Sequence, residues 1–113
     1  RVKFVTLPNN VKTKIVNMLF SERIKELRTI NQMPQRRLAA ALDIDTATYC
    51  KIERGERKAK KEQIVILSNL FHVAHEDLLT LWLADKVSDV IATDKSVASD
   101  VLSLVRNELK HAK

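Results

Sequence analysis

The segment Asp45–Arg57 holds side chains whose types and spacing suit hydrogen bonding to another molecule. Its first residue is a carboxylate that can accept hydrogen bonds from the free N–H groups of a first helical turn. Gly55, the single glycine of the chain, suits the left-handed residue that ends a helix. Tyr49 and Ile52 are three apart and share one face, while the other face carries small or hydrogen-bonding side chains, Thr46, Ala47, Thr48 and Lys51. The pattern predicts a short helix with one buried edge and one open polar edge, a shape that fits the major groove of DNA.

Helical periodicity places this segment third in a series of six expected helices. Apolar residues recur three or four positions apart, and most of the helices have a recognisable start or end. Pro34, which suits only the first turn of a helix, opens the second, and Asp43-Ile44 is the tight connection to the third. With two prolines and one glycine in 113 residues, the composition also favours an all-α fold. The expected helices begin near Leu19, Pro34, Asp45, Glu62, Val73 and Val97.

The charge of the chain is positive and unevenly distributed. The formal net charge is +6 and the sequence pI is about 9.7, which suits a polyanionic partner. Residues 1–18 hold four basic and no acidic side chains. Residues 19–73 hold eleven basic and seven acidic side chains, and residues 74–113 hold five basic and seven acidic side chains. The middle of the chain is therefore expected to face the polyanion, and the last third is not.

Several classes of protein do not fit this sequence. Cys50 is the only cysteine, which rules out an intramolecular disulfide and favours a cytoplasmic protein. No apolar run approaches the roughly 18 residues that a membrane span needs, and a signal peptide is not expected. His72 and His75 are followed by two acids, but these acids suit the first turn of a helix better than a metal site. We expect no enzymatic activity, no cofactor, no metal and no membrane partner.

Residues 2–16 have a pattern of their own. Val2, Phe4 and Thr6 alternate with other residues before Pro8, and a second alternating stretch follows the turn residues Asn9 and Asn10. The alternatives are a weak β-hairpin and a mobile basic arm. Met18 is also a possible natural start of the protein.

Three stretches of the chain carry a family resemblance. They are Ser-Glu-Arg-Ile-Lys-Glu-Leu-Arg at 21–28, Gln-Arg-Arg-Leu-Ala-Ala-Ala-Leu at 35–42 and Tyr-Cys-Lys-Ile-Glu-Arg-Gly-Glu-Arg at 49–57. In combination they resemble the Xre family of helix-turn-helix regulators, which are similar to the phage Cro and cI repressors. The resemblance covers about residues 19–79. It implies a five-helix domain whose third helix enters the major groove of double-stranded DNA.

The resemblance also implies roles for individual residues. Arg28 and Glu53 match a pair that bridges the first and third helices. Base contacts are implied for Gln35, Thr46, Ala47 and Lys51, and phosphate contacts for Arg37, Thr48, Arg57 and Lys58. The chain departs from the family at Gln32 and Asp43, where glycine is common, at Pro34, which replaces a hydroxyl cap, and at Ala59, which replaces a proline. Of these departures, Pro34 is expected to leave the second helix without a side-chain cap.

The last third of the chain has more apolar surface than one small domain can cover. We expect residues 80–113 to form a helical dimerisation extension, after a basic arm or hairpin at 1–18 and a helix-turn-helix domain at 19–79. The alternative is a cap that folds back on the domain. Interface residues are predicted at Leu81, Trp82, Val90, Val101 and Val105. The whole chain is predicted to be a homodimeric transcriptional regulator, a repressor of an inverted-repeat operator. The alternatives are the controller of a restriction-modification cluster and an antitoxin-like protein that binds a protein partner.

Overall fold

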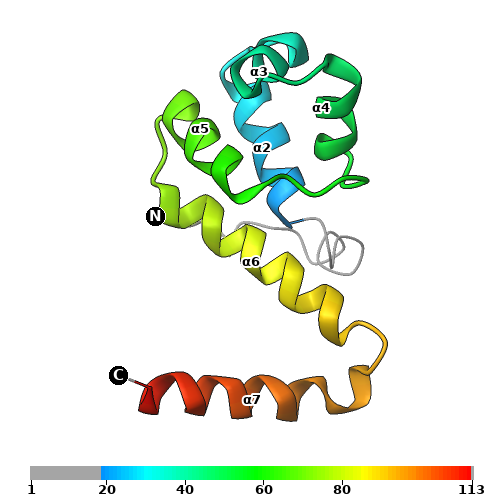
Figure 1. The fold of residues 1–113 in the computed structure, drawn as a ribbon, viewed down its shortest axis with the longest axis vertical. Helices are drawn as coiled ribbons and strands as arrows, with labels where there is room; N and C mark the ends of the chain where they lie inside the picture. The colour runs from blue at the N-terminus through cyan, green and yellow to red at the C-terminus, as the bar shows by residue number, and fades with distance from the viewer. Residues whose placement is uncertain (1–18, 113) are drawn as a thin grey trace.

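The computed structural model describes residues 19–112, and this part of the chain is helical, with no strand. Five helices form a compact domain and the sixth lies apart from it (Figure 1). The expectation of an all-α, five-helix domain with a helical extension is confirmed, whereas the predicted arm or hairpin at residues 1–18 lies outside the described residues. The helices are α2 (Leu19–Ile30), α3 (Gln35–Leu42), α4 (Thr46–Glu53), α5 (Lys61–Phe71), α6 (His75–Ile91) and α7 (Lys95–His111).

Four of these helices end in the same way, and only one of them uses glycine for it. The left-handed residue is Gln32 after α2, Asp43 after α3, Gly55 after α4 and His72 after α5, with φ of 55°, 59°, 80° and 58°. In each case the next residue donates its backbone N–H to a carbonyl five positions earlier, as Ile44 does to Ala39 at 3.0 Å. A left-handed conformation is costly for residues other than glycine, so these three ends are held by the packing around them.

The helix starts differ from one another. Pro34 precedes α3 without a side-chain cap, as the sequence predicted. The start of α2 is capped from a distance, because Asp85 of α6 accepts the backbone N–H groups of Leu19 and Phe20, each at 3.0 Å. Burial raises the pKa of Asp85, and these two hydrogen bonds oppose the rise. The start of α2 therefore depends on α6. The two hydrogen bonds join residues that are separated by 66 and 65 positions in the sequence.

The core is shared by α2 to α6, and α6 is a full member of it. The largest fully buried side chains are Tyr49, Ile24, Leu38, Ile64, Leu67 and Leu78. Leu81 and Trp82 are also buried, at 6% and 9% exposure, and the indole N–H of Trp82 donates to the carbonyl of Ala59 at 2.9 Å. The assignment of Leu81 and Trp82 to a subunit interface is therefore wrong, since both are covered within the domain. The division predicted at residues 79 and 80 falls inside the continuous helix α6.

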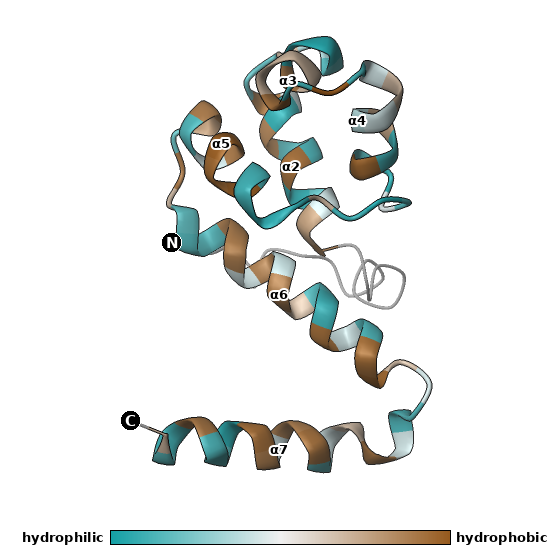
Figure 2. Ribbon diagram, in the orientation of Figure 1, coloured by the Kyte–Doolittle hydropathy of each residue, from teal (hydrophilic) through white to brown (hydrophobic). Residues whose placement is uncertain are grey.

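The C-terminal arm, residues 83–112, has a different character. Figure 2 shows apolar segments along α7 and toward the end of α6, yet no residue of α7 is buried. Of the eleven large hydrophobic residues that are exposed between residues 19 and 112, eight lie in this arm: Leu83, Val87, Val90, Val97, Leu102, Leu104, Val105 and Leu109. The arm therefore has an apolar surface that the domain does not cover.

Candidate nucleic-acid interface

Helices α3 and α4 form one unit with a short connection. Three residues, 43–45, separate them, and Ile44 of this connection packs against the core. Asp45 is the cap of α4, because its carboxylate accepts the backbone N–H of Thr48 at 2.6 Å. That hydrogen bond, with smaller contributions from the charges of Lys51 and Arg57, lowers the pKa of Asp45. The cap is therefore ionised at neutral pH, and the charges of Lys51 and Arg57 favour its ionised form.

The two faces of α4 divide as the sequence predicts. Tyr49 and Ile52 are buried at 0% and 2% exposure. Thr46, Ala47 and Lys51 are exposed, and Thr48 is partly exposed. A helix so placed presents one hydroxyl group, one methyl group and one ammonium group to solvent within two turns. Lysine can donate to the O6 and N7 acceptors of guanine, and the methyl groups of threonine and alanine can contact the methyl group of thymine.

A buried carboxylate holds α4 against the rest of the domain. Glu53, 5% exposed, accepts two hydrogen bonds from Arg28, by Nε at 2.6 Å and by Nη2 at 3.0 Å. The hydroxyl group of Tyr49 donates to the same carboxylate at 2.7 Å and the amide of Gln35 at 2.9 Å. Burial alone would raise the pKa of Glu53, but these hydrogen bonds and the charge of Arg28 bring it below its ordinary value. The expected contact between Arg28 and Glu53 is present, and it bridges α2 and α4.

The carboxylate of Glu53 also shifts the pKa values of Arg28 and Tyr49. The hydrogen bond from Arg28 to Glu53 raises the pKa of the guanidinium. Burial, followed by the hydrogen bond to Glu53, raises the pKa of the Tyr49 hydroxyl group. Arg28 also donates Nη1 to the carbonyl of Met33 at 2.9 Å, in the turn between α2 and α3. Because all of these groups are paired, the cluster fixes the angle between α2, α3 and α4.

Gln35 lies at the start of α3 and connects it to α4. Its amide nitrogen donates to Glu53, and its carbonyl oxygen accepts the thiol of Cys50 at 3.2 Å. The structure thus brings Gln35 beside the helix that carries the other three residues for which we predicted base contacts. Both ends of its amide are already used within the protein, which leaves one amide hydrogen for a contact with DNA. Cys50 is partly exposed, and its role in this geometry is to orient Gln35.

The residues predicted to contact phosphates lie around α4 on three elements. Arg37 is exposed on α3, and Arg57 is exposed in the connector 54–60 between α4 and α5. Lys58, one position further, is paired with Asp89 of α6 at 2.7 Å. Arg54 is paired with Glu56 through two hydrogen bonds, at 2.8 and 3.2 Å. Some cations of this connector are therefore already paired with a carboxylate of the protein, whereas Arg57 is exposed and can bind a phosphate without breaking such a pair.

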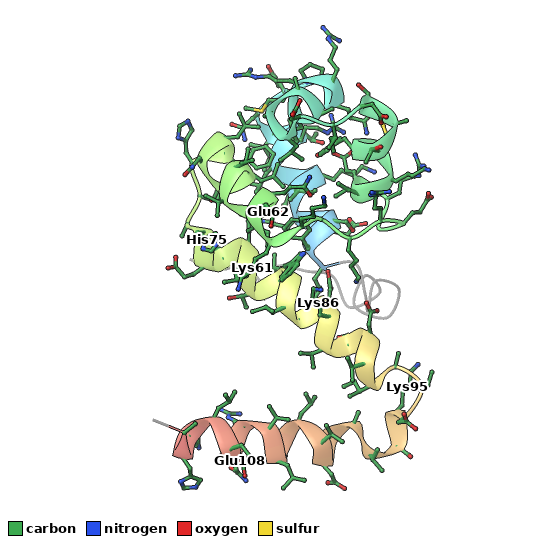
Figure 3. The ribbon with its side chains drawn as sticks, viewed as in Figure 1. Lys61, Glu62, His75, Lys86, Lys95 and Glu108 are labelled. Atoms are coloured by element: carbon green, nitrogen blue, oxygen red, sulfur yellow. The ribbon has the colours of Figure 1, made fainter. Side chains whose placement is uncertain are left out.

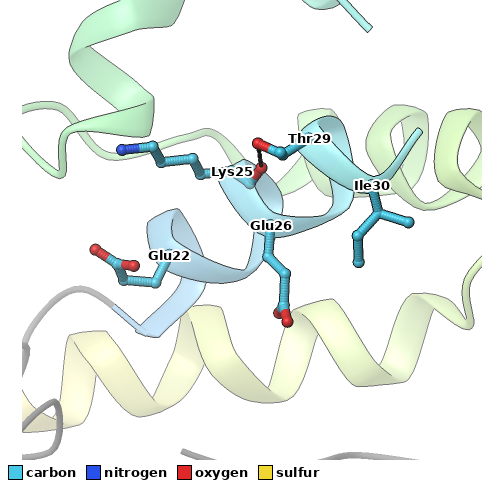
Figure 4. A pocket seen from close by; sticks show the side chains of 5 residues that line it. All are labelled: Glu22, Lys25, Glu26, Thr29 and Ile30. Carbon is cyan, nitrogen blue, oxygen red and sulfur yellow. Dashed lines mark hydrogen bonds between the residues drawn. The ribbon is translucent and has the colours of Figure 1, made fainter. Parts of the chain in front are cut away.

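An open hollow on α2 is lined by Glu22, Lys25, Glu26, Thr29 and Ile30 (Figure 4). Its two carboxylates and one ammonium group give it no excess of positive charge, so it does not suit a phosphate. Within residues 19–112, no group of three or more side chains could hold a metal ion. None of the described helices is long and apolar enough to span a membrane.

Two short helices joined by three residues, the second with an exposed polar face and a basic connector after it, define a helix-turn-helix DNA-binding domain. The sequence model of a helix-turn-helix family matches residues 24–78. Residues 24–78 are thus similar to this Cro/C1-type, Xre-like family. The resemblance found in the sequence is confirmed, and the protein is a DNA-binding transcriptional regulator. No match was found among curated proteins or among solved structures.

Three of the contacts that were not foreseen in the sequence show where its signals end. They are the hydrogen bond from Tyr49 to Glu53, the cap that Asp85 provides for α2, and the ion pair between Lys58 and Asp89. The first had a local signal, because Tyr49 and Glu53 are four apart on one helix and their side chains meet. The other two join residues far apart in sequence, and a single sequence without an alignment carries no signal for them.

Proposed function

We propose that this protein is a cytoplasmic, sequence-specific repressor that binds an inverted-repeat operator as a homodimer. The observation that carries the proposal is the exposed polar face of α4, with Thr46, Ala47 and Lys51 toward solvent and the opposite face fixed by Glu53. A regulator that presents a groove-reading helix to DNA acts most simply by occupying a promoter.

Base recognition would come from α4 and the start of α3. In this proposal Lys51 reads a guanine, Thr46 and Ala47 contact thymine methyl groups, and the free amide hydrogen of Gln35 reaches a neighbouring base edge or phosphate. Thr48, Arg37 and Arg57 would hold the DNA backbone on either side. Such phosphate contacts set the orientation of the domain and most of its affinity, but they carry no sequence information.

The experiment is to select bound fragments from random duplex DNA and then to vary Lys51. We expect an inverted repeat, and we expect Lys51→Ala to lose about 1–3 kcal/mol of discrimination at one base pair in each half-site. The matched control is Lys95→Ala, the same change at the start of α7 and far from α4 (Figure 3). An equal loss of affinity on every sequence would make Lys51 a phosphate contact and would contradict its assignment.

The arm is the proposed dimerisation element. Leu83, Val87 and Val90 lie on one face of α6, on the side away from Trp82 and Asp85, and Val90 is 77% exposed. On α7, Val97, Val101 and Val105 continue an apolar stripe that ends at Leu109, 70% exposed. An exposed patch of several hundred Å² on a small protein usually marks an association site.

A second copy of the chain suits this surface. The arm holds four basic and five acidic residues, so two arms do not repel each other through net charge. To read an inverted repeat, the two α4 helices of a two-fold dimer would have to lie about 34 Å apart, one turn of DNA. Such spacing would let the protein recognise two half-sites at once.

The test uses two substitutions on α7 that add the same charge. Val105→Asp puts a carboxylate into the apolar stripe, whereas Ser103→Asp puts it on the polar face of the same helix. We expect sedimentation to give twice the chain mass of 12.9 kDa for the wild type and for Ser103→Asp, and the single mass for Val105→Asp. A wild-type chain that stays monomeric at all concentrations would refute the dimer, and its uncovered arm would then favour the antitoxin-like alternative with a different protein partner.

A further inference from the structure

We propose that Asp89 of α6 competes with the DNA backbone for Lys58, and so lowers the electrostatic affinity of the domain for DNA of any sequence. This inference rests on the proposed function, because it assumes that the connector 54–60 faces phosphates. It concerns a residue of α6 outside the family match at residues 24–78.

The contact itself is short and accessible. Nζ of Lys58 lies 2.7 Å from Oδ2 of Asp89, and the two side chains are 48% and 39% exposed. An ion pair with this exposure is in contact with water, so a phosphate oxygen can approach the ammonium group. A carboxylate and a phosphate bind lysine in the same way, as anions that accept its hydrogen bonds, and one can replace the other.

The neighbourhood holds Lys58 near its partner. The next residue, Ala59, is buried at 4% exposure, and its carbonyl accepts the indole N–H of Trp82 at 2.9 Å. Trp82 and Asp89 are seven positions apart on α6 and therefore lie on the same side of the helix. Because the backbone beside Lys58 is fixed on the helix that carries Asp89, the two side chains stay within reach of each other.

The rest of the connector shows why one such contact matters. Arg54 is already paired with Glu56, whereas Arg57 lies toward the start of α4, where its charge lowers the pKa of Asp45. Lys58 is thus a cation of the connector whose partner belongs to another helix. Each lysine that is freed for a phosphate adds about 0.9 to the slope of affinity against salt. Asp89 therefore controls whether Lys58 is available to bind a phosphate.

The test is a double-mutant cycle on binding to a mixed-sequence duplex at low salt, measured with the full chain. We expect Asp89→Asn to raise the affinity about two- to five-fold, the range of an exposed ion pair. In a Lys58→Gln background the same substitution is expected to have a much smaller effect, because the competing cation is absent. Asp100→Asn removes an equal charge from α7 and serves as the control for net charge.

The outcomes separate this inference from the proposed function. A rise for Asp89→Asn that exceeds the rise for Asp100→Asn and depends on Lys58 supports the inference. An equal rise in both Lys58 backgrounds, or no rise, overturns it, although the protein still binds DNA. A wild-type chain that does not bind any duplex at low salt overturns the proposed function, and the inference with it. Circular dichroism of each variant shows whether the helices are intact, since all of these substitutions are at exposed positions.

Discussion

Replacing Glu53 by glutamine removes one charge from the centre of the DNA-binding unit and leaves the shape of the side chain almost unchanged. The carboxylate accepts four hydrogen bonds, from Arg28 twice, from Tyr49 and from Gln35, at 2.6 to 3.0 Å. A glutamine has one acceptor oxygen, and its amide nitrogen would face donors. Glu53→Gln therefore leaves at least one buried donor unpaired and leaves the Arg28 guanidinium, 18% exposed, without a counter-charge.

The expected loss of stability is large. Breaking a buried ion pair from one side costs about 3–5 kcal/mol, and we expect about 3 kcal/mol because Arg28 keeps some contact with water. With a urea dependence of about 1.5 kcal/mol per M for a small domain, the unfolding midpoint falls by about 2 M. The buried Trp82 reports the transition by fluorescence, and circular dichroism reports the helices.

Glu56→Gln is the matched control. It makes the same chemical change in an exposed pair, in which the side chains of Arg54 and Glu56 are 56% and 55% exposed, and we expect it to leave the midpoint unchanged. A fall of less than about 0.5 M for Glu53→Gln would refute the argument, because the carboxylate would then have no more effect than a surface acid.

The pH dependence gives a second test of the same residue. Since the pKa of Glu53 is lower in the folded protein than in the unfolded chain, its contribution is present above the unfolded pKa of about 4.3 and is lost as the pH falls through the folded pKa. The difference in stability between the wild type and Glu53→Gln is therefore expected to stay constant from about pH 7 to 5 and to shrink below that. A difference that grows on acidification would contradict the direction of the shift.

Three further substitutions test contacts that hold the domain together. Asp85→Ala leaves the N–H groups of Leu19 and Phe20 without a cap and lowers the urea midpoint. Because burial raises the pKa of Asp85, this loss of stability grows as the pH falls through the folded-state pKa, opposite in sign to Glu53. His72→Gly raises the free energy of unfolding by about 0.5–1 kcal/mol, since glycine adopts the left-handed φ of 58° without strain, and an unchanged or lower midpoint would contradict this. Trp82→Phe leaves the buried carbonyl of Ala59 without its donor and costs about 1–3 kcal/mol, but it does not change the monomer–dimer equilibrium in sedimentation, as it would if the indole lay in an interface.

The helices and the two faces of α4 could be predicted because their causes are local. The spacing of Tyr49 and Ile52, the cap at Asp45 and the glycine at position 55 each act within a few residues, and the structure has all three. The left-handed ends at Gln32 and Asp43 were recognisable only because the family has glycine there. The end at His72 had no such signal, because its conformation follows from the packing of α5 against α6.

The role of α6 could not be predicted for a related reason. Its sequence is apolar around more than one face, and periodicity alone does not show which face the domain covers. The structure shows that Leu78, Leu81 and Trp82 face the core, while Val87 and Val90 remain exposed. The prediction that assigned Trp82 to the interface as part of this surplus apolar surface was therefore wrong, whereas Val90 is exposed and available for an interface.

The acidic residues of the DNA-binding unit explain how a domain with many carboxylates can meet a polyanion. Asp45 accepts the N–H of Thr48, Glu53 is buried and accepts four hydrogen bonds from three residues, and Glu56 is paired with Arg54. Each of these carboxylates is thus paired with a donor of the protein. Asp89 follows the same rule, but its donor is Lys58, a cation that the proposed interface would use. Elsewhere in the unit, such pairing keeps a carboxylate from repelling DNA, but the pair with Asp89 occupies a lysine that would otherwise bind a phosphate. For this reason, the pair with Asp89 is the one whose loss is expected to strengthen DNA binding.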